Sequence, residues 1–464
     1  MTVSPPFRIF FPQQKRFPVS LYNALRKIPI MTAQQHVQHL LDFIDQSPSP
    51  WHAVATVETA IQAAQFVRLD ETAKWSLQAG GRYYVVRDDS SIVLFVVGRK
   101  APAESGFKIV GAHTDSPGFR IRPNVATVND GLARLGVEIY GGPILATFAD
   151  RDLSLAGRIS YVDEQGNLAY KRVRFDRPLL RLPNLAIHMN RGVNEDGLKF
   201  HKQNELPLLF AQLTSGQLPK PYFLQLLEQA TGIGAKQLLS WDLAVYDTQK
   251  GAFWGANEEF YADSQIDNLA SCHAALQAML DDSVLNHAES TLVCAFFDHE
   301  EIGSESHIGA GGSFLSDVLQ RISIAASSER EDTARALAQS FLISADMAHA
   351  YQPNFPSAYD ADHRVFVNKG PVIKSNANRR YSSESVSIAH FIRWCEEAGV
   401  PHQRYSHRSD LPCGSTIGPI ASAKLGIRSV DIGCPMWAMH SVRESAGVQD
   451  HEYMIQVLKR FFSD

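Results

Sequence analysis

The sequence predicts an α/β fold, in which a mixed, mostly parallel sheet is flanked by helices and interrupted by an inserted β-rich domain. Residues 292–297 form a continuous apolar run, which is typical of a strand buried on both faces of a parallel sheet. Similar runs alternate with helical patterns before about residue 118 and after about 240. Between these limits the strands alternate apolar and polar residues, as in half-exposed antiparallel sheets.

Composition restricts the class of protein. The 464 residues are enough for two or three domains, and the net charge of -5, without a dense Lys/Arg stripe, argues against a nucleic-acid partner. No apolar run has the length of a membrane span. The five cysteines lack CxxC spacing and fit reduced thiols, so we expect a cytoplasmic protein without a membrane partner.

Residues 1–30 differ from the rest of the chain, because they contain several prolines and basic residues but no acidic residue. An organelle presequence is one interpretation. We favour the other, in which Met31 is the natural start, since the sequence already has a folded pattern from Thr32 onward. Residues 1–30 are therefore expected to lie outside the fold and to be dispensable.

The α/β domain is expected to comprise residues 31–117 and 241–464. Its first part has helical patterns at 34–46 and 52–65, and strands at 81–86, 91–97 and 107–112. The inserted domain, 118–240, has strands near 137–140, 156–162 and 171–175, separated by Gly-rich turns. The second part has helices at 270–280, 314–323 and 383–398, and strands at 292–297, 341–345 and 427–432.

Ionisable residues stand where the buried strands end or where the next helix begins. Ligands of open α/β sheets bind at the carboxyl ends of the strands, so we expect these side chains to converge. Two histidines among carboxylates suit zinc, manganese or cobalt. The candidates are His113, Asp115, Asp267, Glu300, Glu301, Asp346 and His440.

Two neighbouring metal ions need a carboxylate that bridges them. Asp267 is the natural bridge, because it stands at a turn into a helix. His113 and Asp346 would complete one metal site, and Glu301 and His440 the other. Each residue also has a structural interpretation, such as a helix cap for Asp267 or a turn residue for Asp346. Their coincidence at one edge of a sheet favours the metal site.

The adjacent carboxylates Glu300 and Glu301 repel each other unless a cation or a proton lies between them. A metal-dependent hydrolase needs one carboxylate to bind the cation and one to take a proton from water. On an extended strand end the two side chains would point in opposite directions, so that the two neighbours can take these different roles. Asp115, two residues beyond His113, would orient the imidazole.

Five motifs closely resemble those of the aspartyl aminopeptidases, a family of di-metal (zinc) exopeptidases. The resemblance runs from about 40 to 460, in the same order along the chain. The motifs are GAHTDSP at 111–117, QIDNL at 265–269, DHEEIGS at 298–304, SADMAHA at 344–350 and MHS at 439–441.

The resemblance implies a zinc-peptidase fold with two divalent ions, most often Zn²⁺, with Mn²⁺ or Co²⁺ as alternatives. It assigns the general-base role to Glu300 and the metal-ligand roles to His113, Asp267, Glu301, Asp346 and His440. It also implies that segment 370–381 contacts the substrate, through Lys374 and Tyr381 in our assignment. Arg379 replaces the glutamine that is usual in the family, so the fine substrate preference is an open point.

Further implications concern the assembly and the backbone. Family members are dodecamers built from dimers, and the segment around His188 resembles the one that reaches into a neighbouring subunit's site. The inserted domain is thus expected to mediate dimerisation, with His188 contacting substrate. The peptide bond between Asp267 and Asn268 is expected to be cis, as is common after the bridging aspartate in this clan.

The expected function is release of N-terminal residues, preferably Asp or Glu, from peptides with a free N-terminus. A metal-bridging hydroxide would attack the carbonyl after the first residue, with Glu300 as general base, and the cations Lys374 and His188 would pair with the acidic side chain. The alternatives are an aminopeptidase of broader specificity, or a di-metal amidase or deacylase. A catalytically dead binding protein on this fold should lack Glu300 or a ligand, and none is missing.

Overall fold

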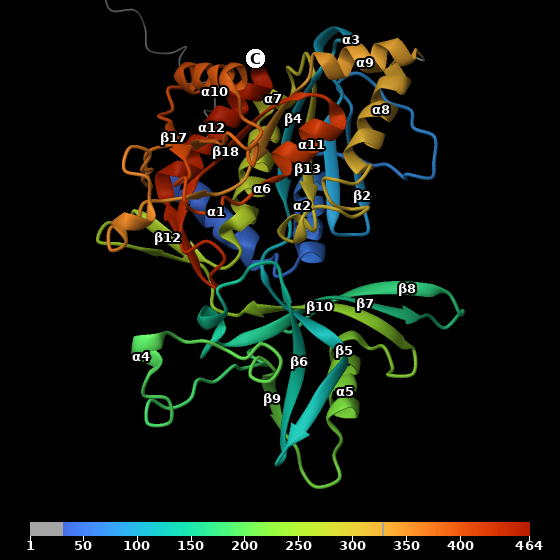
Figure 1. Ribbon diagram of the computed structural model, residues 1–464. Coiled ribbons are helices and arrows are strands. Elements are labelled where there is room, and N and C mark those ends of the chain that lie inside the picture. The colour runs from blue at the N-terminus through green and yellow to red at the C-terminus, as the bar shows by residue number, and fades with distance from the viewer. Residues whose placement is uncertain (1–30, 327–328) are drawn as a thin grey trace, which may run out of the picture. The chain divides into compact units, whose positions relative to one another are not determined.

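Figure 1 presents a computed structural model that describes residues 31–326 and 329–464. The prediction made for residues 1–30 concerns a segment outside the described residues. Ala33–Asp464 form a compact unit. In the part of the chain that is described, no helix is both long and apolar enough to cross a bilayer.

The main sheet is mixed and mostly parallel, which confirms the predicted fold class. Its four central strands, β13, β4, β14 and β18, run parallel to one another, and antiparallel pairs join the strands on either side. In sheet order the strands are β1 (Val67–Arg68), β2 (Arg82–Arg87), β3 (Ser91–Val96), β13 (Thr291–Phe297), β4 (Phe107–His113), β14 (Phe341–Ala345), β18 (Arg428–Gly433), β16 (Val372–Ser375) and β17 (Gln403–Ser406).

Helices cover both faces of this sheet, which explains the continuous apolar run in β13. Cys294 and Phe296 face one core, while Val293 and Ala295 face the other. The first core includes α1 (Ala33–Asp45), α2 (Pro50–Ala63), α6 (Ile266–Met279), α7 (Asp282–Leu285), α10 (Ser385–Ala398) and α12 (Val448–Ser463). The second includes α8 (Phe314–Ala326), α9 (Arg330–Ala338) and α11 (Ile417–Leu425).

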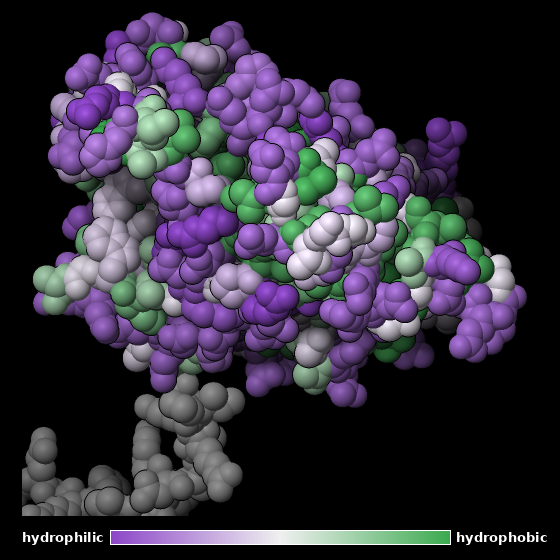
Figure 2. All heavy atoms as spheres, turned by 90° about the horizontal axis from the view of Figure 1, so that it is seen from below, coloured by the Kyte–Doolittle hydropathy of each residue, from purple (hydrophilic) through white to green (hydrophobic). Residues whose placement is uncertain are grey.

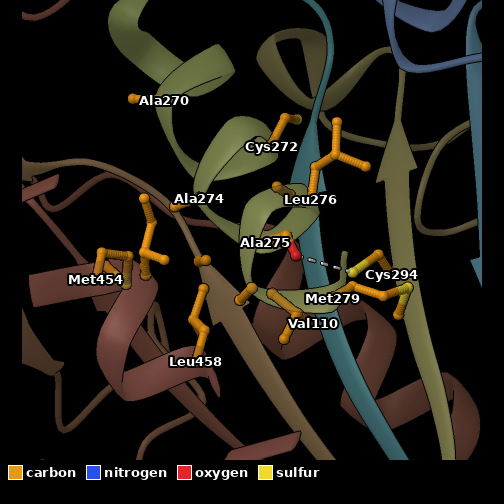
Figure 3. Close-up of a cluster of buried hydrophobic side chains, with 14 of the residues drawn as sticks. Val110, Ala270, Cys272, Ala274, Ala275, Leu276, Met279, Cys294, Met454 and Leu458 are labelled. Carbon is orange, nitrogen blue, oxygen red and sulfur yellow. Dashed lines mark hydrogen bonds between the residues drawn. The ribbon is translucent and has the colours of Figure 1, made fainter. Parts of the chain in front are cut away.

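Helix α6 is buried on almost every side (Figure 3). It packs between α12 and the strands β4 and β13, and its many alanines allow close approach on each side. The Cys294 thiol on β13 donates a hydrogen bond to the Ala275 carbonyl at 3.7 Å. This packing fixes the start of the helix, where Asp267 lies, relative to the main sheet.

A second sheet is antiparallel and is built mostly from residues of the predicted inserted region, 118–240. Its core includes α5 (Pro219–Thr231). The strand β10 continues to Asp247, and the domain limits of 118–240 stay a prediction. In sheet order the strands are β8 (Leu168–Arg174), β7 (Leu153–Val162), β10 (Leu238–Asp247), β5 (Gly118–Asn129), β6 (Leu132–Tyr140) and β9 (Leu208–Gln212).

The surface of this second region carries exposed apolar side chains. Leu185 and Met189 are 67% and 76% exposed, and they flank the exposed His188. Figure 2, which views the molecule from below Figure 1, shows apolar side chains gathered among polar ones on the side turned to the viewer. Exposed apolar groups of this kind are typical of surfaces that bind another protein.

A third, five-stranded sheet was not predicted, because its strands are too short to give a clear pattern. Its order is β11 (Ala252–Trp254), β12 (Phe260–Asp263), β20 (Glu444–Gly447), β19 (Pro435–Trp437) and β15 (Ala348–His349). Strand β12 leads into α6, and β20 follows the loop that carries His440. Pairing of β12 with β20 therefore brings His440 close to the start of α6.

The remaining elements are short. They are the helices α3 (Pro102–Ser105) and α4 (Val193–Asp196) and the 3-10 turns η1 (Leu145–Phe148), η2 (Glu300–Ile302) and η3 (Pro356–Ala358). Of these, η2 belongs to the candidate site.

Candidate metal centre

Predicted site residues from five segments converge at one edge of the main sheet. β4 ends at His113, and the neighbouring parallel strands β13 and β14 lead to Glu301 and Asp346. Asp267 joins them from the start of α6, and His440 from the loop between β19 and β20. The carboxyl ends of parallel strands meet at one edge, which brings these residues together.

The side chains form two groups that share Asp267. His113 Nε2 lies 3.5 Å from Asp267 Oδ1 and 3.5 Å from Asp346 Oδ1. His440 Nε2 lies 3.4 Å from Asp267 Oδ2 and 3.4 Å from Glu301 Oε2. One oxygen of Asp267 thus faces each histidine, as a bridging carboxylate requires.

This geometry fits metal ions. Ligand atoms about 2.0–2.2 Å from a tetrahedral zinc ion lie about 3.3–3.6 Å from one another, which matches the spacing of both groups. Asp267 Oδ1 is buried and has no hydrogen-bond partner, although a buried carboxylate oxygen normally has one. A cation would satisfy it. The sets of ligating atoms within 4.8 Å of one another are His113/Glu300/Glu301, His113/Asp267/Asp346 and Asp267/Glu301/His440.

The charge balance of the site favours a cation as well. Burial alone would lower the pKa of His440, but the carboxylates of Asp267 and Glu301 outweigh it and raise this pKa to about 11. Burial raises the pKa of Glu301 to about 7, chiefly because the charged form loses its hydration. The protein groups alone therefore hold protons at positions where a divalent cation would supply the positive charge.

Asp115 is fully buried next to the candidate site. His113 Nδ1 lies 3.4 Å from its Oδ1 and 3.0 Å from its carbonyl oxygen. The backbone N–H groups of Glu300 and Glu301 each donate to its carboxylate at 3.1 Å, and the Tyr140 hydroxyl donates at 2.7 Å. Asp115 thus touches both the imidazole and the adjacent glutamates. Tyr140 was not predicted, since nothing in its strand distinguishes it from a structural tyrosine.

Glu300 and Glu301 do not continue strand β13. The prediction that they point in opposite directions because they lie on an extended strand end was therefore wrong. Glu300 and Glu301 lie in the 3-10 turn η2, after His299 in the left-handed region at φ 66°. The amide contacts with Asp115 hold this turn. Glu301 nonetheless faces His440, whereas Glu300 Oε2 lies 4.0 Å from His113 Nε2. Burial raises the pKa of Glu300 well above its ordinary value, which makes it a stronger base.

A pocket of about 290 Å³ opens onto these residues, and Lys374 and Tyr381 line it. Lys374 is buried, with its Nζ 3.5 Å from Asp346 Oδ2 and 5.2 Å from the centre of the Tyr381 ring. His349, which was not predicted, also lines the pocket. The structure thus places both Lys374 and Tyr381 beside the candidate metal site, and their contact with substrate stays a prediction.

His188 is not brought to this centre within the chain. It is exposed, it lies in the predicted inserted region (118–240), and it does not line the pocket. The peptide bond between Asp267 and Asn268, in contrast, is cis, which confirms that prediction.

Comparison with known proteins identifies the family. Residues 43–462 match the family described as "Aminopeptidase I zinc metalloprotease (M18)". The chain belongs to the M18 family. The predicted resemblance is therefore confirmed, and the protein is a metal-dependent M18 aminopeptidase.

Individual relatives agree with this assignment. A probable M18 family aminopeptidase 2 of Pseudomonas paraeruginosa is 46% identical over 429 residues, which cover 92% of this chain and 97% of the relative. A cryo-EM structure of the Ape4 and Nbr1 complex superimposes with a TM-score of 0.90 and 38% identity, covering 93% of this chain and 86% of the other. The Saccharomyces cerevisiae mApe1 dodecamer gives 0.81 and 26%, with coverage of 92% and 95%.

Proposed function

We propose that this M18 enzyme releases N-terminal Asp or Glu from peptides with a free N-terminus. The observation that carries this specificity is Lys374, a buried ammonium group in the pocket beside the metal centre. Burying an acidic side chain is costly unless a cation pairs with it, and Lys374 supplies that cation. Tyr381 lies beside it and would shape the same subsite.

Two divalent ions would be held by the five converging ligands, with zinc proposed and manganese or cobalt as alternatives. His113, Asp267 and Asp346 would hold one ion, and Asp267, Glu301 and His440 the other. The distances and the unpartnered Oδ1 of Asp267 support this division. When bound, such ions lower the pKa of a water molecule toward neutrality and polarise the substrate carbonyl.

The protein side of the reaction follows from the positions of the remaining residues. Glu300 would take a proton from the attacking water and pass it to the leaving amine. The Asp115 carboxylate would accept a hydrogen bond from the backbone N–H of Glu300 and orient the imidazole of His113 through its Nδ1. The general base and the metal ligand would thereby keep fixed positions relative to each other. Tyr140 would hold Asp115 in turn through its hydroxyl.

We further propose that residues 31–117 and 241–464 form the catalytic domain and that 118–240 mediate assembly into a dodecamer built from dimers. The exposed Leu185 and Met189 support an interface there, and the exposed His188 would then reach the substrate of a second subunit. The five cysteines are free, which supports a cytoplasmic location.

Asp-, Glu-, Leu- and Ala-p-nitroanilides test the proposed function directly. After chelation the protein should be inactive, and refilling with zinc, manganese or cobalt should restore turnover that is fastest with the Asp and Glu substrates. Preference for Leu or Ala would indicate an aminopeptidase of broader specificity. Activity only on amides with a blocked N-terminus would indicate a deacylase.

Lys374→Met is expected to lower kcat/KM for the Asp substrate about 10–100-fold relative to the Leu substrate, since a hydrogen bond to a charged group contributes about 1.5–3 kcal/mol. The measurement is the ratio of the two kcat/KM values. Lys369→Met, at an exposed position nearby, is the matched control and should leave the ratio unchanged. An unchanged ratio in Lys374→Met would show that Lys374 does not set the specificity.

A further inference from the structure

Glu444 contacts the metal centre through the backbone of two proposed ligands. It is the first residue of β20 and is 2% exposed. Its Oε2 accepts a hydrogen bond from the backbone N–H of Asp267 at 2.9 Å, and its Oε1 accepts one from the backbone N–H of His440 at 2.6 Å. A single carboxyl group thus joins two segments that are far apart in the sequence.

Neither segment is held by regular secondary structure at this point. Asp267 lies in the first turn of α6 but has non-helical angles, φ −82° and ψ 104°. His440 has φ 68°, in the left-handed region that non-glycine residues rarely adopt. Because no helix or sheet ladder fixes the backbone here, its position depends on individual contacts, among them those that Glu444 accepts from both amides.

We propose that Glu444 is a positioning residue that holds Asp267 and His440 at the separation at which both bind one cation, and thereby raises the affinity for that cation. The inference rests on the proposed ligand roles of these two residues. Glu444 itself belongs to none of the described groups that could hold a metal ion. It acts on the ligands through their amides, as outer contacts of metal sites commonly do.

Only a glutamate suits this position. Each of its two oxygens accepts from one amide, whereas a glutamine would turn its NH₂ group toward one of the two N–H donors. An aspartate keeps the charge, but its side chain is one methylene shorter and cannot reach both amides. E444Q and E444D therefore disturb the same contact in different ways.

The test measures zinc affinity by competition with a chromogenic chelator for the wild type, E444Q and E444D. Asp450→Asn is the matched control, because Asp450 is also a buried carboxylate that accepts from two backbone amides, those of Asn368 and Gly370. Asp450 does not line the pocket. We expect E444Q and E444D to bind zinc about 10–100-fold more weakly, and Asp450→Asn to bind it as the wild type does.

Thermal unfolding of the metal-free proteins separates positioning from a merely structural role. Lower melting temperatures of the Glu444 variants with unchanged zinc affinity would overturn the proposal. If E444Q does not fold, the zinc affinity of E444D decides.

Asp267→Asn is measured alongside: if it loses zinc while the Glu444 variants retain full affinity, only this inference is wrong. If Asp267→Asn itself retains full affinity, the proposed metal centre is wrong.

Discussion

Glu300→Gln is expected to lower kcat about 10²–10⁴-fold, while the metal ions stay bound, because a glutamine cannot take a proton from the attacking water. The substitution changes the shape of the side chain little. Glu300 contacts Asp115 through its backbone N–H, which is retained, so the turn that also carries Glu301 should be preserved. The loss should therefore lie in turnover and not in assembly of the site.

Steady-state kinetics and elemental analysis on the same preparation check this result. Glu305→Gln, at an exposed position in the same loop, is the matched control and should keep normal kcat and metal content. A Glu300→Gln enzyme that retains its metal and turns over at the normal rate would show that Glu300 is not the base. Loss of metal would instead assign it as a ligand, in the group with His113 and Glu301.

His188→Ala is expected to reduce turnover about 10²–10³-fold without changing metal content or melting temperature. Its imidazole would donate a hydrogen bond near the developing oxyanion or the acidic side chain of the partner's substrate, and such a donor contributes about 2.7–4 kcal/mol. Because His188 is exposed within its own chain, its removal should leave the packing of that chain intact. His201→Ala, at another exposed histidine of the same region, is the matched control.

Subunit mixing tests this idea most directly. Chains with His188→Ala carry an intact Glu300, and chains with Glu300→Gln carry an intact His188. A site formed by the first chain and completed by the second should be active, so a mixture of two inactive proteins should regain part of the activity after subunit exchange. A mixture that stays inactive although exchange is demonstrated by differently labelled chains would return His188 to a structural role.

Three of the proposed ligands, His113, Glu301 and Asp346, could be predicted from the sequence because they stand at or just beyond the ends of strands whose pattern is easily recognised. In β13 every residue is buried, and the abrupt change to charged residues at Asp298 marks the end of the strand. In the same way, His113 is the last residue of β4, and Asp346 directly follows the end of β14. These positions can be predicted because a parallel arrangement brings the carboxyl ends of the strands to one edge of the sheet.

Other parts of the site depend on contacts that leave no periodic signal. Glu444 acts on backbone amides, so its partners are set by tertiary structure and not by residue type or spacing. The direction of Glu300 depends on a 3-10 turn held by Asp115, which a strand pattern does not reveal. Short strands such as β15 and β19 are stable only within their sheet, which is why the sequence did not predict them.

On the proposed assignment, the contact between Lys374 and Asp346 would couple substrate selection to metal retention. Asp346 turns Oδ1 toward His113 and Oδ2 toward Lys374, so on the proposed assignment one carboxylate serves the cation and the ammonium group together. An acidic ligand that neutralises Lys374 removes a positive charge from beside the ion and therefore tightens metal binding. Thermodynamic reciprocity then requires that the metal tighten the binding of the acidic ligand by the same factor.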